Sequence, residues 1–132
     1  MFPSIVTVQT RVKKVADKHI VQFYNTFSNE WESDIELTFT TSGMAIFTLD
    51  TDGDVEPYVF FGALQQVPED GTPDTNWDFV INGEGNIISF TNSCKNTQNI
   101  AVRLTLVPWN AENIDDAIIS ADPRIRNQPG SN

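Results

Sequence analysis

The central part of this chain of 132 residues contains no lysine and no arginine. Between His19 and Cys94 there are thirteen Asp and Glu residues, all eight basic residues lie outside that stretch, and the formal net charge is −10. An acidic field of this kind repels phosphate backbones and anionic lipid headgroups, and it attracts cations and basic surfaces. The charge therefore predicts that neither a nucleic acid nor a membrane is the partner.

Residues that often carry catalysis or cross-links are scarce. Cys94 is the only cysteine and His19 the only histidine, so an internal disulfide and a zinc site of the Cys/His type are both excluded. A Ser-His-Asp arrangement would have to use His19, and no nucleophile-elbow motif accompanies it. No motif identifies a general base that could deprotonate Cys94, and the sequence contains no glycine-rich loop of the phosphate-binding type. We therefore expect a protein that is not an enzyme, and a small hydrolase is only the third hypothesis.

Long hydrophobic runs are also lacking. The first residues have neither the basic nor the apolar region of a secretory signal, and no segment has the length of a membrane span. The compartment stays open, with the cytoplasm as the default expectation.

A length of 132 residues with 39% hydrophobic residues fits one domain with one core. We expect that domain over residues 1–120 and an extended tail over 121–132, which has two prolines and little apolar content.

What the chain has in abundance is alternation of apolar and polar residues. Residues 34–40, 77–82 and 101–106 each place an apolar set of side chains on one face and a set that is polar, apart from Val80 and Ala101, on the other. The inward sets are Ile35, Leu37 and Phe39; Trp77, Phe79 and Ile81; and Val102, Leu104 and Leu106. This period is typical of half-buried antiparallel strands. The predicted fold is all-β, an antiparallel two-sheet sandwich of about seven to nine strands.

Two segments, 44–49 and 55–61, have apolar residues in both phases, which predicts central strands or strands with one face in an interface.

Turn residues separate the strands. Asp52-Gly53 suits a two-residue hairpin, residues 82–86 a longer hairpin and residues 68–71 a turn that opens a loop. One short helical turn is expected after Trp109, where Asn110 could cap a segment that contains three acids, Glu112, Asp115 and Asp116.

The densest acidic motif contains Asp50, Asp52, Asp54 and Glu56, four carboxylates within seven residues. Calcium prefers several oxygen ligands of this kind. The motif is no EF-hand, because Gly53 stands fourth rather than sixth, and Phe61 takes the position of the bidentate glutamate. Two interpretations stay open: a hairpin turn whose acids are solvated, or a Ca²⁺ site completed by the acids of residues 69–74.

The three tryptophans each have an amide or acidic neighbour, a combination that also occurs in sugar-binding sites. Trp31 and Trp77 are in phase with apolar neighbours and are expected to cap the core. Trp109 is out of phase with the strand before it, so it is the candidate for an exposed contact, with Asn110 beside it.

Four of the eight basic residues, Arg11, Lys13, Lys14 and Lys18, lie within eight positions. They predict either an edge strand protected by positive charge or packed beside acidic strands that it neutralises, or a basic segment that meets the acidic face of another copy. The preferred function is a binding or assembly module that recognises a protein partner or itself. The alternative is a carbohydrate-binding, lectin-like module, with Ca²⁺ as its cofactor in one version.

Overall fold

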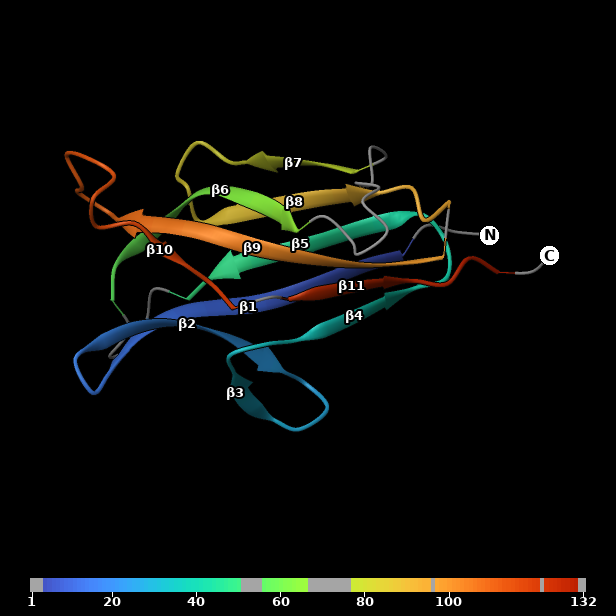
Figure 1. Cartoon of the computed structure of the whole chain (residues 1–132), viewed down its shortest axis with the longest axis horizontal. Coiled ribbons are helices and arrows are strands. Elements are labelled where there is room, and N and C mark those ends of the chain that lie inside the picture. Colours follow the sequence, from blue (N-terminus) through green and yellow to red (C-terminus); the bar gives the residue numbers. More distant parts are fainter. Residues whose placement is uncertain (1–3, 51–55, 67–76, 96, 122, 131–132) are drawn as a thin grey trace.

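The computed structural model describes residues 4–50, 56–66, 77–95, 97–121 and 123–130. Within these residues the chain forms eleven strands and no helix, in two sheets packed face to face (Figure 1). The predicted all-β sandwich is thereby confirmed. The strands are β1 (Ser4–Val15), β2 (Lys18–Asn25), β3 (Glu30–Glu32), β4 (Glu36–Phe39), β5 (Gly43–Leu49), β6 (Tyr58–Gln66), β7 (Trp77–Ile81), β8 (Ile87–Asn92), β9 (Gln98–Pro108), β10 (Ile118–Ile119) and β11 (Arg124–Asn127).

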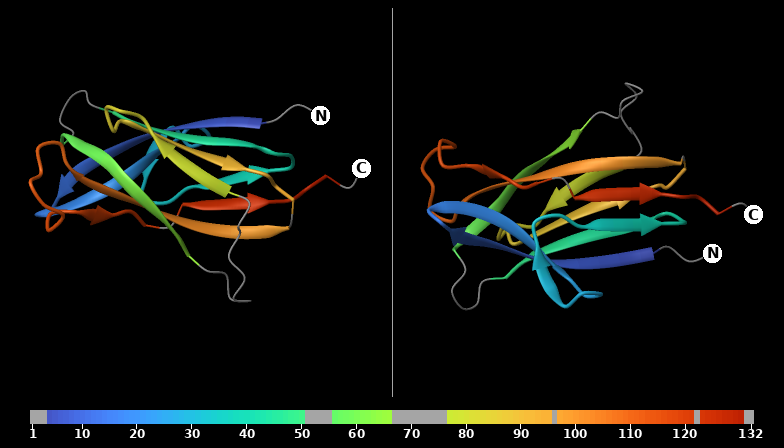
Figure 2. Two further views of the ribbon diagram at one scale, coloured as in Figure 1. Left: turned by 90° about the horizontal axis from the view of Figure 1, so that it is seen from above. Right: turned by 60° about the horizontal axis from the view of Figure 1, so that its bottom comes forward.

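Both sheets are mixed rather than purely antiparallel. The six-stranded sheet has the order β3-β2-β1-β5-β8-β7, and in the five-stranded sheet β10, β9, β11 and β4 follow one another while β6 also pairs with β9. β1 pairs with β5 in parallel, and so does β11 with β4, whereas the other pairs are antiparallel. The two layers are seen from other directions in Figure 2. Alternation of apolar and polar residues specifies which face of a strand is buried. The alternation is the same in parallel and in antiparallel pairs, so it could not predict the direction of pairing.

The core lies between the two sheets and follows the predicted alternation. Leu37 and Phe39 of β4 are buried, and Phe79 and Ile81 of β7 pack against the core. Three further inward residues of β9 are also buried: Val102, Leu104 and Leu106. Large aromatic rings fill the centre, where the Phe47 ring lies edge-on to two others, with centroids 5.7 Å from Phe23 and 5.8 Å from Phe90. Rings in this geometry stabilise a core beyond the area they bury.

The two segments with apolar residues in both phases have different positions. β5 lies inside the six-stranded sheet between β1 and β8, as predicted for a central strand. β6 is an edge strand that pairs with β9 alone among the described strands, so a central place was the wrong prediction for it. A β-bulge between Phe60 and Gly62 shifts its register by one residue. The shift moves apolar residues from one phase to the other without a second neighbouring strand.

The basic segment of β1 is not an edge either, because β1 lies between β2 and β5. Positive and negative charges are instead divided between strands and connections. Seven of the eight basic residues lie in strands: Arg11, Lys13, Lys14, Lys18, Arg103, Arg124 and Arg126. Of the twelve acidic residues in the described part, only Glu30, Glu32, Glu36 and Asp78 lie in strands. Six of these seven cations lie on the outer faces of the sheets, whereas Lys14 has the inward phase at the hairpin end of β1. The connections carry most of the acids.

The expected turns have mixed outcomes. Residues 82–86 do connect β7 to β8, and the Gly85 amide donates to the Asn82 carbonyl at 3.0 Å. Asp52 and Gly53 lie outside the described residues, but the strands on either side, β5 and β6, belong to different sheets. The connection is therefore a crossing between layers and not a two-residue hairpin. Residues 68–71 also lie outside the described part.

The C-terminal segments also differ from expectation. Residues 109–117 form hydrogen-bonded turns, closed by Ala111 N to Pro108 O and by Ala117 N to Ile114 O, both at 3.0 Å, in place of the helical turn. The segment expected as a tail is extended, but its strand β11 lies between β9 and β4. Ile125 and Asn127 of that strand are buried, so it belongs to the sandwich. None of the described residues forms a helix that could cross a membrane.

The tightest hairpin joins β1 to β2 through Ala16 and Asp17, whose φ values are 50° and 67°. Positive φ at both positions is typical of a type I′ turn, which favours asparagine and glycine over alanine. We expect Ala16→Asn to stabilise the protein by about 0.5–1 kcal/mol, measured by urea unfolding. The exposed Ala111, which is not among the positive-φ residues, is the control, and Ala111→Asn should change stability less. Equal effects would contradict the strain at Ala16.

Candidate functional site

The outer face of the six-stranded sheet has an apolar centre. It is made by the side chains of β1, β5, β8 and β7 that point away from the core, namely Ile5, Met44, Ile46, Ile87 and Val80, and we call it the open face. The register makes them neighbours, because Ile5 pairs with Met44, and Ile46 and Val80 both pair with Ser89. Ile5 is 67% exposed and Val80 68%. Apolar residues gathered on a solvent-facing sheet surface are typical of an interaction site.

An aromatic and cationic strip adjoins this centre on β1, β2 and β3. The Tyr24 and Trp31 rings meet edge-on, with centroids 5.3 Å apart, and the Arg11 guanidinium lies 4.2 Å from the Trp31 ring centroid. Arg11 Nε also donates to Gln22 Oε1 at 2.9 Å. The cation–π contact and the hydrogen bond hold Arg11 in one orientation. Tyr, Trp and Arg are the residue types that contribute most to protein–protein binding.

The position of Trp31 corrects a prediction. Trp31 was expected to cap the core in phase with Ile35 and Leu37, yet it lies half-buried on the outer face beside Tyr24. The phase does not continue because β3 belongs to the six-stranded sheet and β4 to the five-stranded sheet, so the chain changes layer between them. The side chain of Trp77 lies outside what the structure describes.

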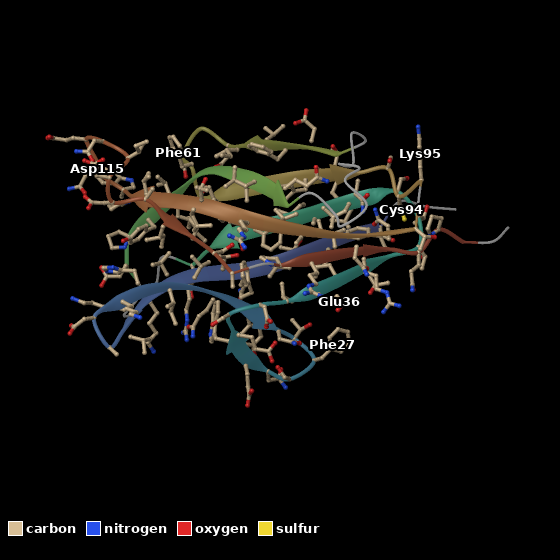
Figure 3. The ribbon with its side chains drawn as sticks, viewed as in Figure 1. Phe27, Glu36, Phe61, Cys94, Lys95 and Asp115 are labelled. Atoms are coloured by element: carbon tan, nitrogen blue, oxygen red, sulfur yellow. The ribbon has the colours of Figure 1, made fainter. Side chains whose placement is uncertain are left out.

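A second candidate is a pocket of about 410 Å³ at the end of the sandwich where the β1–β2 hairpin and the β9–β10 connection lie, which we call the loop-end pocket. Figure 3 labels Asp115 of that connection, at the end opposite Cys94 and Lys95. The lining is His19, Glu56, Pro57, Tyr58, Pro108, Asn110, Asp116 and Ile118. Trp109 N donates to Pro57 O at 2.9 Å, which fastens the β9–β10 connection to the start of β6.

The loop-end pocket brings together residues that the sequence proposed for different sites. Glu56 came from the calcium motif and Asn110 from the tryptophan motif, and both line it. Trp109 is 71% exposed, as predicted, although its role in ligand binding stays a prediction. His19, Tyr58 and Asp116 were not grouped with them. Tyr58 and Asp116 come together through the pairing of β6 with β9 and of β9 with β10, and His19 of β2 reaches them only because the two sheets pack face to face.

The calcium motif is described only at its two ends. The Asp50 amide donates to Thr10 O at 2.7 Å and the Glu56 amide to Val12 O at 3.0 Å, so both ends are attached to β1. Asp52 and Asp54 lie outside the described residues, as do the acids of residues 69–74. Among the described residues, no group of three or more His, Cys, Asp or Glu side chains is placed to hold a metal. Calcium binding by this motif stays a prediction.

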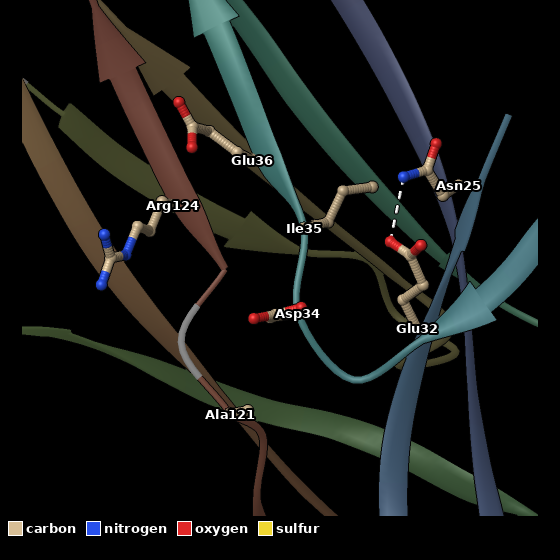
Figure 4. Close-up of a pocket in the computed structure, with 7 residues that line it drawn as sticks. All are labelled: Asn25, Glu32, Asp34, Ile35, Glu36, Ala121 and Arg124. Atoms are coloured by element: carbon tan, nitrogen blue, oxygen red, sulfur yellow. Dashed lines mark hydrogen bonds between the residues drawn. The ribbon is translucent and has the colours of Figure 1, made fainter. Parts of the chain in front are cut away.

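A third candidate is an acidic groove of about 600 Å³ beside the β3–β4 connection. Its carboxylates belong to Glu32, Asp34 and Glu36, while Arg124 lies on its other side (Figure 4). Glu32 accepts a hydrogen bond of 2.9 Å from Asn25 Nδ2, drawn in Figure 4. Glu36 also lies 3.7 Å from an Arg126 nitrogen. The groove attracts cations, but its acids point in different directions and are partly engaged. From the sequence, Asp34 and Glu36 were assigned to the polar face of a strand and Glu32 was an acidic neighbour of Trp31, and the three were not grouped.

Cys94 lies near a smaller hollow of about 330 Å³, which Ser93 and residues 40–42 also line. The thiol is buried and donates to the Phe39 carbonyl at 3.4 Å, and the backbone of Cys94 has a φ of 52°. Burial raises the pKa of Cys94, and a hydrogen bond from the Gln128 backbone opposes that rise. A raised pKa leaves less thiolate at neutral pH, which is the reverse of what a nucleophilic cysteine requires.

Comparison with known proteins gives one result for the whole sandwich. No curated protein matches the chain. The sequence profile described as the DP-EP family matches residues 4–129. These residues run from the start of β1 to beyond β11, and so include the open face and the loop-end pocket. Because the match extends over nearly the whole chain, this protein belongs to the DP-EP family.

Proposed function

We propose that this protein is a non-enzymatic assembly module that recognises a second copy of itself through the open face. The observation that carries the proposal is the apolar centre of that face, where Ile5 and Val80 are both more than 60% exposed. Covering such a surface with a second sheet would remove apolar area from water, which is the main favourable contribution to association. Two twisted sheets can pack face to face in this way at about 10 Å.

The aromatic and cationic strip supports recognition rather than unspecific adhesion. Trp31, Tyr24 and Arg11 are fixed by contacts with one another before any partner arrives, so little side-chain entropy remains to be lost on binding. A preorganised Trp, Tyr and Arg group beside an apolar centre has the composition of a binding hot spot. The strip and the apolar centre lie on the same face of one sheet.

Charge is divided along the open face. Arg11, Lys13 and Lys18 lie near the hairpin end of β1 and β2. Asp78 of β7 lies level with Ile5 at the other end, because Asp78 pairs with Thr91, Thr91 with Met44 and Met44 with Ile5. A two-fold axis parallel to the strands would keep these opposite charges apart, so the contact that we propose is carried by the apolar centre.

Substitution of Val80 tests the open face. Val80→Lys and Val80→Asp both place a charge in the apolar centre. We expect wild-type protein to form dimers and both variants to dimerise at least tenfold more weakly, because the apolar contact is lost and a charge would be buried. Analytical ultracentrifugation over a range of protein and salt concentrations measures the dissociation constants.

The control is Leu64→Lys, because Leu64 is 53% exposed on the outer face of the other sheet. It adds the same charge elsewhere and should leave dimerisation unchanged. A wild-type protein that stays monomeric at all concentrations and salts would contradict self-association. Dissociation constants of both Val80 variants equal to that of the wild type would contradict the open face as the contact.

A further inference from the structure

The loop-end pocket has chemistry that the proposed dimer does not use. It lies at one end of the sandwich, whereas the open face is the outer surface of one sheet, so the two can act independently. The residues that line it come from β2, from residues 56–58 where β6 begins, from the end of β9 with the β9–β10 connection, and from β10. A hydrogen bond from Trp109 N to Pro57 O attaches the β9–β10 connection to the start of β6.

Two aromatic rings form one wall of this pocket. The His19 and Tyr58 centroids are 5.7 Å apart with an interplanar angle of 50°, and Tyr58 is only 9% exposed. Burial, followed by the negative charges of Glu56 and Asp116, raises the pKa of Tyr58. The phenol therefore stays neutral at physiological pH. The same effect indicates that the fields of both carboxylates reach the ring.

The acids Glu56 and Asp116 line the pocket, while Lys14, which pairs with His19 in the β1–β2 hairpin, is not among the lining residues. Glu56 and Asp116 contribute two carboxylates from separate connections, and the described lining residues include no Lys or Arg. Anions are repelled from such a pocket. A metal ion lacks a third carboxylate, histidine or cysteine ligand within the described residues. An organic cation would meet both carboxylates and the electron-rich face of an aromatic ring.

We propose that the loop-end pocket binds a primary ammonium group on an alkyl chain, with Glu56 and Asp116 as its charge partners and Tyr58 as its aromatic contact. The alkyl chain would lie against Pro57, Pro108 and Ile118. A volume of about 410 Å³ is sufficient for such a group. Two sources share this chemistry, the lysine side chain of a protein and a free polyamine.

His19 provides a direct measurement because it is the only histidine in the chain, so its ring gives one set of imidazole NMR signals. The probes are Nα-acetyl-lysine amide, spermidine and, as a neutral match, Nα,Nε-diacetyl-lysine amide, all at one fixed pH. The charged probes should shift the His19 signals with saturation, and acetylation of the ε-amine should weaken binding at least tenfold. Tighter binding of the lysine amide assigns a protein side chain as the source, and tighter binding of spermidine a polyamine.

Conservative variants locate the site. Glu56→Gln and Asp116→Asn should each weaken binding of the preferred probe about tenfold, as expected when a charge-assisted contact is lost. Glu112→Gln is the matched control, because Glu112 lies in the same connection as Asp116 but does not line the pocket. Its effect should be less than twofold. The Val80→Lys variant should bind as wild type does, which separates this site from dimerisation.

Three results would overturn the proposal. One is equal binding of the neutral diacetylated probe, and another is an effect of Glu112→Gln as large as that of Glu56→Gln. The third is saturable shifts of the His19 signals with a neutral sugar such as galactose but with neither amine. That last outcome would favour the carbohydrate site predicted for Trp109 and Asn110.

Discussion

Replacement of Asn127 by alanine is expected to destabilise the fold by about 3 kcal/mol, because it breaks a buried amide pair between the two sheets. Asn92 of β8 and Asn127 of β11 exchange two hydrogen bonds, at 2.8 Å and 3.1 Å, and their exposed fractions are 4% and 1%. After the substitution the Asn92 amide would keep the Cys94 backbone amide as donor to its oxygen, but its own NH₂ group would lose Asn127 as acceptor. A buried donor without a partner costs far more than the bond itself contributes.

Urea unfolding of Asn127→Ala measures the loss directly, and thermal unfolding should show a melting temperature lower by roughly 10 °C. In a double-mutant cycle with Asn92→Ala, the two effects should fall short of additivity by more than 1 kcal/mol, since either change alone leaves an unpaired amide. Asn99→Ala, at an exposed position of β9, is the control and should cost less than about 0.5 kcal/mol. Additive effects within error would show that the pair is not coupled.

Substitution of Gly43 by alanine is expected to cost about 2–3 kcal/mol, because the parallel pairing of β1 and β5 leaves no room for a side chain there. Gly43 pairs with Ser4 at the start of both strands, and a Cβ atom at Gly43 would overlap the Ser4 carbonyl oxygen. The opposite side is closed too, since the Phe39 ring would lie 3.1 Å from the same Cβ. The overlap could be relieved only if the backbone at Ser4 moved, and that backbone also donates the hydrogen bond from Ser4 N to Ser42 O.

Gly83→Ala is a matched control for Gly43→Ala, because a Cβ at Gly83 would have no heavy atom within 4 Å. We expect that variant to change the free energy of unfolding by less than about 0.5 kcal/mol. Hydrogen exchange in β1 should also be faster in Gly43→Ala, because the strain is applied where β1 begins. Equal stability of the two variants would contradict the close approach of β1 and β5.

Some of the candidate sites could be recognised in the sequence, but only in part. The apolar residues in both phases of 44–49 indicated that β5 has two apolar faces, and Met44 and Ile46 now lie on the open face. Trp109 was identified as exposed because it is out of phase with β9. Convergence of Glu56 with His19 and Asp116 could not be predicted, because it depends on the pairing of β6, β9 and β10 in one sheet and on the packing of β2 from the other sheet against them.

Turn chemistry was the least informative local signal. Asp52-Gly53 has the strongest hairpin sequence in the chain, yet β5 and β6 on either side of it lie in different sheets. The two-residue hairpin is formed instead by Ala16 and Asp17, which lack glycine and accept positive φ values. Pairing of β1 with β2 over six residue positions from Thr10 to Val15 outweighs the local strain of that turn.

The sequence by itself determined that this protein is an all-β sandwich and which side of each regular strand faces the core, because the period of two is a local property of the chain. Only the tertiary structure decided which strands are neighbours, that β1 and β5 and also β4 and β11 run in parallel, and that cations gather on sheet faces while most described acids gather in connections. Those features arise from contacts between residues far apart in the sequence, and alternation is the same whichever partner a strand finds.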